Sequence, residues 1–196
     1  MSISRRARTL LSTVVLVCAG LTAARSDAAP VTRNVQRYMV KVPNSNREAG
    51  AARALAHAPS ERLRSVVTDY ARYSRTIPQF KNTRVVGRSG GRTDVYLEVP
   101  ILGGLSSLWA VVRFEAPEAK GNQHIIRGHL VRGNVKRLDA TWRIEKVDEQ
   151  KSVLSLELLV VPDLPAPTSV VSAELRKAAG KAVNAARIEA EIPLRR

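Results

Sequence analysis

The sequence predicts an α+β domain in which a curved antiparallel sheet wraps around one long C-terminal helix. Two observations predict this fold class. Residues 82–161 read as a series of short strands, and residues 168–188 form a continuous helix-forming segment after a proline-marked break at 162–167. Two short helical segments precede most of the strands. A helix laid across a strongly bent sheet can enclose a cavity, and cavities of this kind hold apolar ligands.

The first 28 residues have the layout of a secretory signal peptide. Arg5, Arg6 and Arg8 form a basic start, residues 10–24 form an apolar core, and small residues lead to a cleavage site after Ala28. The apolar core is shorter than the roughly 20 residues of a permanent membrane helix. We therefore expect an exported protein, periplasmic or secreted. The basic start also resembles a twin-arginine signal, so the export route stays open.

The composition of the mature chain limits its chemistry and its partners. The only cysteine, Cys18, lies in the predicted signal peptide, so disulfides, thiolate metal sites and cysteine nucleophiles are not expected. The formal net charge of the chain is +15, and removing the net +3 of residues 1–28 leaves about +12. Such a charge favours contact with anionic membrane surfaces. Aromatic residues make up 4% of the chain, too few for the stacking platforms of a nucleic-acid binder, so we expect no such partner.

The mature chain is predicted to form an N-terminal extension over 29–50, a main domain over 51–191 and a short tail over 192–196. A possible strand over 35–42 lies in the extension, and a second strand follows over 50–58 with alanine at every other position. Pro59 opens a helix with Leu and Val at helical spacing. A second short helix over 69–73 follows, and Pro78 ends this region.

The remaining strands are predicted from the alternation of apolar and polar residues. A tight turn at Ser89-Gly90-Gly91 joins the first two of them. An apolar, glycine-rich loop over 100–104 follows the second strand and could gate the mouth of a cavity. The expected strands cover residues 83–87, 93–99, 108–115, 125–132, 138–147 and 152–161.

The C-terminal helix is predicted to present one apolar stripe to the sheet. Alanine dominates this stripe, so it either lets helix and sheet approach closely or leaves room between them for a guest molecule. The sequence leaves both possibilities open. The stripe consists of Val171, Leu175, Ala178, Ala182, Ala185 and Ile188.

Few residues are candidates for catalysis. His124 and His129 are five positions apart on one predicted strand, so their side chains point to opposite faces and cannot hold a metal together. Asp69 and Tyr70 could act as an acid and a phenol, but Asp69 fits better as a residue that caps or braces the two short helices. No nucleophile elbow, zinc motif or phosphate loop is present in the sequence. We predict no catalytic residue, no metal and no cofactor.

The order of these features resembles the START-like polyketide cyclase/dehydrase superfamily, and within it the coenzyme Q-binding, lipid-transfer branch. The features are Pro59-Ser60-Glu61 before a Leu/Val helix, residues 69–73 leading to Ile77-Pro78, Trp142 within a strand, and the proline break before the last helix. The resemblance spans residues 52–186. It implies a helix-grip fold with a hydrophobic tunnel under the long helix. The chain departs from the pattern at Thr141, where relatives often have glycine, and in its export signal.

Three functions are open at this point. The first is an exported carrier that holds a lipid or other hydrophobic small molecule between helix and sheet. The second is a cyclase/dehydrase-type enzyme acting on a polyketide-like substrate, and the third is a module with a fully packed core that binds nothing. Strand alternation and helical period select the residues expected to line the cavity. These are Val95, Leu97, Phe114, Trp142, Leu156, Leu158, Leu175, Ala178 and Ala182.

Overall fold

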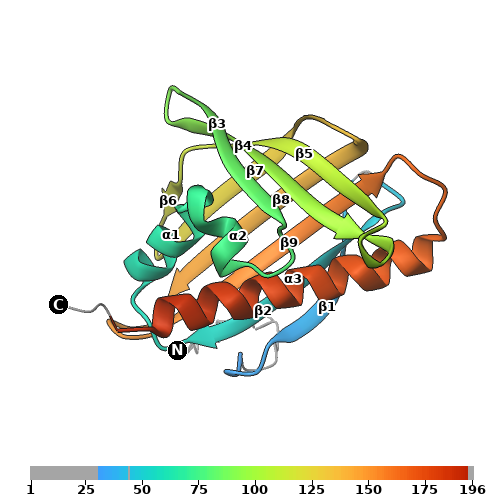
Figure 1. The fold of residues 1–196 in the computed structure, drawn as a ribbon. Coiled ribbons are helices and arrows are strands. Elements are labelled where there is room, and N and C mark those ends of the chain that lie inside the picture. Colours follow the sequence, from blue (N-terminus) through green and yellow to red (C-terminus); the bar gives the residue numbers. More distant parts are fainter. Residues whose placement is uncertain (1–30, 44, 194–196) are drawn as a thin grey trace, which may run out of the picture.

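The computed structural model describes residues 31–43 and 45–193, which form one curved, nine-stranded antiparallel sheet and a long C-terminal helix (Figure 1). The strands follow the order β1-β2-β9-β8-β7-β5-β4-β3, and β6 pairs with β7. The predicted helix-grip fold is confirmed. The predicted signal peptide over 1–28 lies outside the described residues.

The elements follow the predicted order along the chain. The helical elements are α1 (Ser60–Thr68), the 3-10 turn η1 (Tyr70–Arg72), α2 (Tyr73–Thr76), the 3-10 turn η2 (Leu102–Gly104) and α3 (Thr168–Glu191). The strands are β1 (Gln36–Lys41), β2 (Glu48–Ala56), β3 (Asn82–Ser89), β4 (Arg92–Ile101), β5 (Ser106–Phe114), β6 (Glu118–Lys120), β7 (Gln123–Gly133), β8 (Val135–Lys146) and β9 (Ser152–Pro162).

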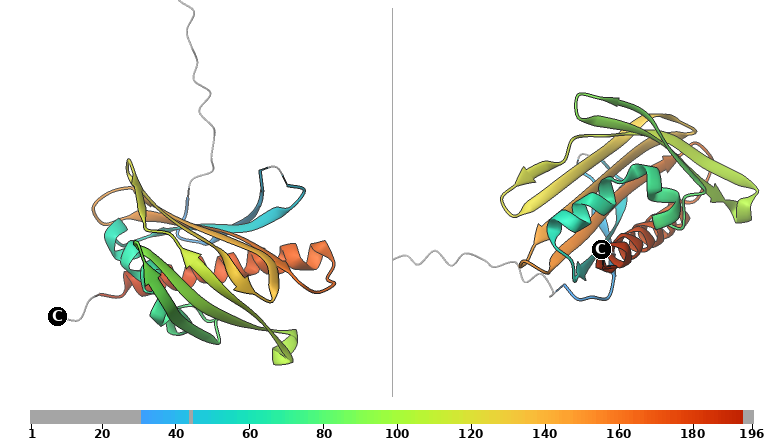
Figure 2. Two further views of the ribbon diagram at one scale, coloured as in Figure 1. Left: turned by 90° about the horizontal axis from the view of Figure 1, so that it is seen from above. Right: turned by 60° about the vertical axis from the view of Figure 1, so that its left-hand side comes forward.

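The sheet bends so that β3, β4 and β5 turn away from the plane of β2, β9 and β8, and the helices lie on its concave side (Figure 2). Strand β1 pairs with β2 over its whole length, so the chain from Gln36 onward is part of the same sheet as the main domain. The short strand β6 was not predicted. Pro100 and Ile101, expected to start a loop, instead end strand β4.

The alanines of β2 are explained by the close approach of α3. Ala52, Ala54 and Ala56 are fully buried, and a side chain at Gly50 would meet the backbone of α3. Alanine is a poor strand former, so its use here reflects the lack of space beneath the helix rather than strand propensity. Close packing is therefore what the small residues provide along β2.

The buried stripe of α3 is rotated relative to the predicted one. Leu175 and Ala182 are buried as expected, but Ile188 is 48% exposed, so its assignment to the stripe was wrong. The helix rests mainly on β2 near one side of the sheet rather than across its middle, and this position selects a different face of the helix. The buried residues of the helix are Leu175, Ala179, Gly180, Ala182, Val183, Ala186 and Ala190.

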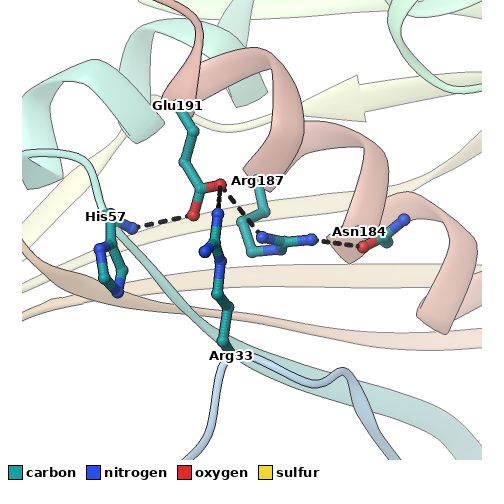
Figure 3. A network of polar contacts seen from close by, with 5 residues as sticks. All are labelled: Arg33, His57, Asn184, Arg187 and Glu191. Atoms are coloured by element: carbon teal, nitrogen blue, oxygen red, sulfur yellow. Dashed lines mark hydrogen bonds and ion pairs between the residues drawn. The ribbon is translucent and has the colours of Figure 1, made fainter.

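The C-terminal end of α3 is held by a polar network around Glu191 (Figure 3). The Glu191 carboxylate accepts hydrogen bonds from the backbone N–H of His57 at 3.0 Å, from Arg33 at 3.2 Å and from Arg187 at 3.1 Å. Arg187 also donates to Asn184 at 2.9 Å. This network ties the helix end to the N-terminal segment and to the end of β2. Within the described residues, no helix has both the length and the apolar character needed to cross a membrane.

Candidate ligand-binding face

One end of the concave face is filled by protein side chains. Inward-facing residues of five neighbouring strands are completely buried there, because α1, η1 and α2 cover them. Leu63 and Val67 of α1 supply apolar contacts from above. We call this region the closed end. The strand residues are Val95, Val112, Ile126, Ile144 and Leu154.

An aromatic cluster completes the closed end. The ring of Tyr70 stacks on Phe114 with centroids 4.4 Å apart, and Tyr73 packs against Phe80 at 5.8 Å. The hydroxyl of Tyr73 donates to the Val67 carbonyl. Burial raises the pKa of both tyrosines, most strongly for Tyr73, where a hydrogen bond with Trp142 opposes the shift. Both phenols therefore stay protonated near neutral pH, and they are better suited to packing than to proton transfer.

The opposite end of the concave face is apolar but only half covered. Its side chains pack against the core on one side and reach solvent on the other. The strand register places them on the same face as the buried residues of the closed end. Leu138 pairs with Val160 and Leu158 with Ala140, an even number of residues along β8 and β9 from the buried pair Ile144 and Leu154. We call this set the open end. It consists of Leu108, Leu138, Leu158 and Val160, and Leu130, which pairs with Val112, lies at its border with the closed end.

The structure spreads the nine predicted lining residues over the concave face and α3, from Val95 at the closed end to Leu158 at the open end. The six on strands all lie on the concave face, by their register. Leu158 and Ala178 are half-buried and belong to the exposed side, and the other seven are buried, with Leu97 the most exposed of these at 8%. The predicted set therefore reaches the open end only at its edge. Sequence alternation placed the six strand residues on the concave face, but it carried no signal for which end of the face the helices cover.

A pocket of about 290 Å³ lies beside the open end. Val160 and Val171 form part of its wall, together with the connection from β9 to α3 and the turn between β1 and β2. Arg47 and Lys136 add basic groups to its rim. None of the nine predicted lining residues takes part in this pocket.

The predicted gating loop is strongly apolar and exposed. Leu102 is 71% exposed, and Leu105, the first residue after the predicted loop, is 91% exposed. The φ angles of Leu102, Gly103 and Gly104 are all positive, and the two glycines adopt this conformation at little cost. The antiparallel register puts the loop, which connects β4 to β5, at the same end of the sheet as the β9–α3 connection. It therefore stands at the open end.

The histidines do not converge. His124 lies on the concave side, 2.9 Å from Glu61, whereas His129 lies on the convex side, 3.8 Å from Glu115. This confirms that the two side chains point to opposite faces. Asp69, predicted to cap or brace the two short helices, makes no side-chain capping hydrogen bond, but its carboxylate lies 4.0 Å from Arg72 of η1, which fits the bracing role. Among residues 31–43 and 45–193, no group of three His, Cys, Asp or Glu side chains could hold a metal ion.

Solved structures with the same architecture include lipid transfer proteins and an aromatase/cyclase. The chain is similar to a STAR-related lipid transfer protein from Xanthomonas axonopodis, with a TM-score of 0.70 and 14% identity over 84% of this chain and 97% of that chain. It is also similar to human StAR-related lipid transfer protein 5, with a TM-score of 0.68 and 7% identity over 83% and 85%. For the Zhui aromatase/cyclase from a Streptomyces species, the TM-score is 0.55 and the identity 15%, over 81% and 94%. At these identities the likeness establishes the fold.

The family is established by the sequence itself. No curated protein matches the chain significantly. A family model described as polyketide cyclase / dehydrase and lipid transport matches residues 57–187, which run from the end of β2 almost to the end of α3. The match covers well over half of the chain and includes both the closed and the open end of the concave face. The chain therefore belongs to the polyketide cyclase/dehydrase and lipid-transport family.

Proposed function

We propose that the chain is an exported carrier that holds a lipid or other hydrophobic small molecule against the open end of its concave face. The observation that carries this proposal is a set of partly buried apolar side chains, which includes Leu108, Leu138 and Val160 and is continuous with a fully buried core. Covering such a surface with an apolar ligand contributes roughly 25 cal/mol for each Å² removed from water. The basic, apolar and small-residue pattern of residues 1–28 supports export.

A carrier fits the polar groups of the concave face better than a cyclase/dehydrase does. The nearest phenols, Tyr70 and Tyr73, are buried at the closed end, and both are held protonated. His124 is engaged with Glu61 beside α1, away from the open end. The alternative is a cyclase/dehydrase-type enzyme, because the similar Zhui structure is that of an aromatase/cyclase. Turnover of a polyketide-like substrate by this chain would favour that alternative.

Native mass spectrometry of protein purified from its own host tests both the ligand and export. We expect an additional mass that organic extraction removes, together with a polypeptide mass corresponding to a start at Ala29. Protein that retains Met1 in the cytoplasm would contradict export. If repeated preparations carry no extractable hydrophobic molecule and take up none from a lipid extract, the carrier proposal is wrong.

The substitution Ala178→Trp tests where the ligand sits. Ala178 is half-buried, and its carbonyl accepts a hydrogen bond from Gln79 at 3.3 Å, so this side of α3 faces the segment between α2 and β3. An indole here should fill the space beside α3 next to that segment. It should weaken binding of an apolar fluorescent probe by about tenfold or more, the equivalent of about 1.4 kcal/mol. The matched control is Ala173→Trp, an exposed site on the same helix. Equal probe binding by the two variants would place the ligand elsewhere.

The exposed loop and the surrounding basic residues suit contact with an anionic membrane during ligand exchange. Leu102 and Leu105 would enter the headgroup region, and each of them would contribute roughly 1.5–3 kcal/mol if fully buried. Arg47, Arg132 and Lys136 are exposed at the same end of the sheet, and each base near an anionic surface adds about 1 kcal/mol.

Vesicle co-sedimentation of Leu105→Asp tests this contact. We expect binding to vesicles of mixed neutral and anionic phospholipid to fall by about tenfold or more. The control is Val147→Asp, which changes another exposed aliphatic residue, 56% exposed, after the opposite end of β8. If both variants bind as the parent does, the loop is not the membrane contact.

A further inference from the structure

Strand β1 forms one edge of the sheet, and its outer side has no neighbouring strand among residues 31–43 and 45–193 (Figure 1). We call this side the free edge. β1 pairs with β2 in an unbroken register over Gln36–Lys41. β3, at the other end of the strand order, has a register shift between Val85 and Gly87. Bulges of this kind protect an edge from further pairing, so the regular strand β1 is the better acceptor for another strand.

Three residues of β1 direct their backbone N–H and C=O groups to the free edge. The N–H of Val42, just after the strand, donates to the Arg47 carbonyl at 3.1 Å and therefore points across the β1–β2 hairpin. Hydrogen bonding in an antiparallel ladder repeats every two residues, so Val40 and Tyr38 also direct their N–H groups to β2. The residues between them point the opposite way. They are Arg37, Met39 and Lys41.

The side chains of the same three residues lie along α3. The Nε atom of Arg37 is 2.2 Å from the place that a Cβ atom on Gly180 would take, so this side chain lies against the helix. Side chains alternate along a strand, so Met39 and Lys41 share the face of Arg37. Met39 also pairs with Gly50, which lies directly against the backbone of α3. A strand added at the free edge would therefore place every other side chain beside α3.

The surface beside the free edge is basic. Four exposed bases lie there, and among the described residues none of them makes an ion pair or a side-chain hydrogen bond. Two acids lie close by. Glu48 is opposite Lys41 on β2, and Glu174 is already paired, 3.4 Å from Lys177. The four bases are Arg37 and Lys41 on β1 and Arg176 and Lys181 on α3.

We propose that β1 accepts an extended acidic segment of a partner protein, which adds to the sheet as a further antiparallel strand. The backbone of this segment exchanges hydrogen bonds with Arg37, Met39 and Lys41. Its side chains follow the pattern acid, any residue, apolar, any residue, acid. The two acids then lie opposite Arg37 and Lys41, and the apolar side chain lies opposite Met39.

A second copy of the chain fits the free edge less well. In the fully overlapping antiparallel register, Met39 would face its counterpart, and Arg37 would face Lys41 on both sides of it. Like charges directly opposite one another destabilise a strand pair, and basic side chains commonly protect edges from self-pairing. Charge complementarity therefore favours an acidic partner. The proposal uses no residue of the open end, so it stands or falls separately from the carrier function.

The peptide Thr-Glu-Thr-Val-Thr-Glu-Thr carries the required pattern and tests the proposal on the mature protein. Added to about 1 mM, which half-fills a site with a Kd of about 1 mM, it should shift the backbone amide signals of Arg37, Met39 and Lys41 saturably in ¹H–¹⁵N NMR spectra. The same amides should gain protection from hydrogen exchange, whereas those of Tyr38 and Val40 should change little. A peptide with lysine in place of glutamate should bind at least about tenfold more weakly. If the acidic peptide leaves these amides unchanged, the proposal is overturned.

Two N-methylated peptides separate strand addition from plain charge attraction. A methyl group on the valine nitrogen removes the N–H that donates to Met39, and it should weaken binding by at least about tenfold. The same methyl group on the threonine after the valine points away from β1, so binding should stay within about threefold of the parent peptide. Equal affinities of the two methylated peptides would mean that no strand is added at this edge, and the proposal would be wrong.

Substitutions in the protein test the two bases of β1. Arg37→Gln combined with Lys41→Gln should weaken peptide binding by about tenfold without loss of folding, since both side chains are exposed. The matched control, Arg75→Gln combined with Arg88→Gln, removes two exposed charges near the other edge of the sheet and should leave binding unchanged. An equal loss in both double variants would contradict the assignment. A stable dimer of the parent protein in analytical ultracentrifugation, with the free-edge amides protected before peptide is added, would assign the edge to a second copy and overturn the proposal.

Discussion

Replacing Gly50 with alanine tests the close contact between β2 and α3. A Cβ atom at this position would lie 2.3 Å from the carbonyl carbon of Leu175 and 2.4 Å from the backbone nitrogen of Arg176. Ordinary contacts begin near 3.4 Å, so the helix must retreat from the sheet by about 1 Å. The atoms in the way are backbone atoms of a regular helix, and they cannot rotate aside as a side chain can.

The expected cost is that of overpacking a well-packed core. We expect Gly50→Ala to lower the free energy of unfolding by about 2–3 kcal/mol. For a chain of this size, each kcal/mol shifts the melting temperature by about 2–4 °C, so a fall of about 5–10 °C follows. Thermal and urea unfolding, followed by circular dichroism, measure both quantities on the mature protein.

Gly87→Ala is the matched control. Gly87 also lies in a strand, but its nearest neighbours are side-chain atoms of Asp94 at 3.7 and 3.8 Å, which is ordinary contact. We expect this variant to unfold within about 0.5 kcal/mol of the parent. If Gly50→Ala is as stable as Gly87→Ala, then α3 does not pack on β2 as closely as described, and the reasoning about its small residues fails.

Two further predictions concern α3. Gly180→Ala should be neutral or should raise the free energy of unfolding by up to about 1 kcal/mol, because alanine is the better helix former. The atoms that a Cβ would meet belong to the exposed side chain of Arg37, which can move aside. Urea unfolding measures the change, and a large loss of stability would mean that the Arg37 side chain is held in place. Burial of Glu191 raises its pKa, but hydrogen bonds from the His57 backbone, Arg33 and Arg187 outweigh this and hold the pKa below its ordinary value. The carboxylate therefore stabilises the fold above the unfolded pKa of about 4.3, and this stabilisation is lost as the pH falls through the lower folded pKa. Glu191→Gln should cost about 1–3 kcal/mol at pH 7, and the gap to the parent should narrow at acidic pH; a gap that is constant from pH 7 to pH 3 would contradict this.

The pattern of the sequence was sufficient for the fold class and for the inward faces of the strands. Alternation along a strand has a fixed period of two, so residues such as Val95, Phe114 and Trp142 could be assigned to the concave side without any knowledge of their partners. The proline break before residue 168 fixed the start of α3, since proline is favoured at a helix start and excluded from its interior.

Contacts between distant segments were decided only by the tertiary structure. The face of α3 that is buried depends on where the helix rests, and it rests on β2 rather than across the sheet, so Ala179 and Ala186 are buried while Ile188 is exposed. Which end of the concave face is closed depends on where α1 and the tyrosine cluster fold back, and this separates the buried predicted residues from Leu158 and the open end. A pocket between α1 and the end of α3 brings together Arg62 and Glu189, which are far apart in the chain, and no local pattern marks either of them. Periodicity is a property of one segment, whereas burial and pairing are properties of two segments brought together, and this is why the sequence alone determined the first and not the second.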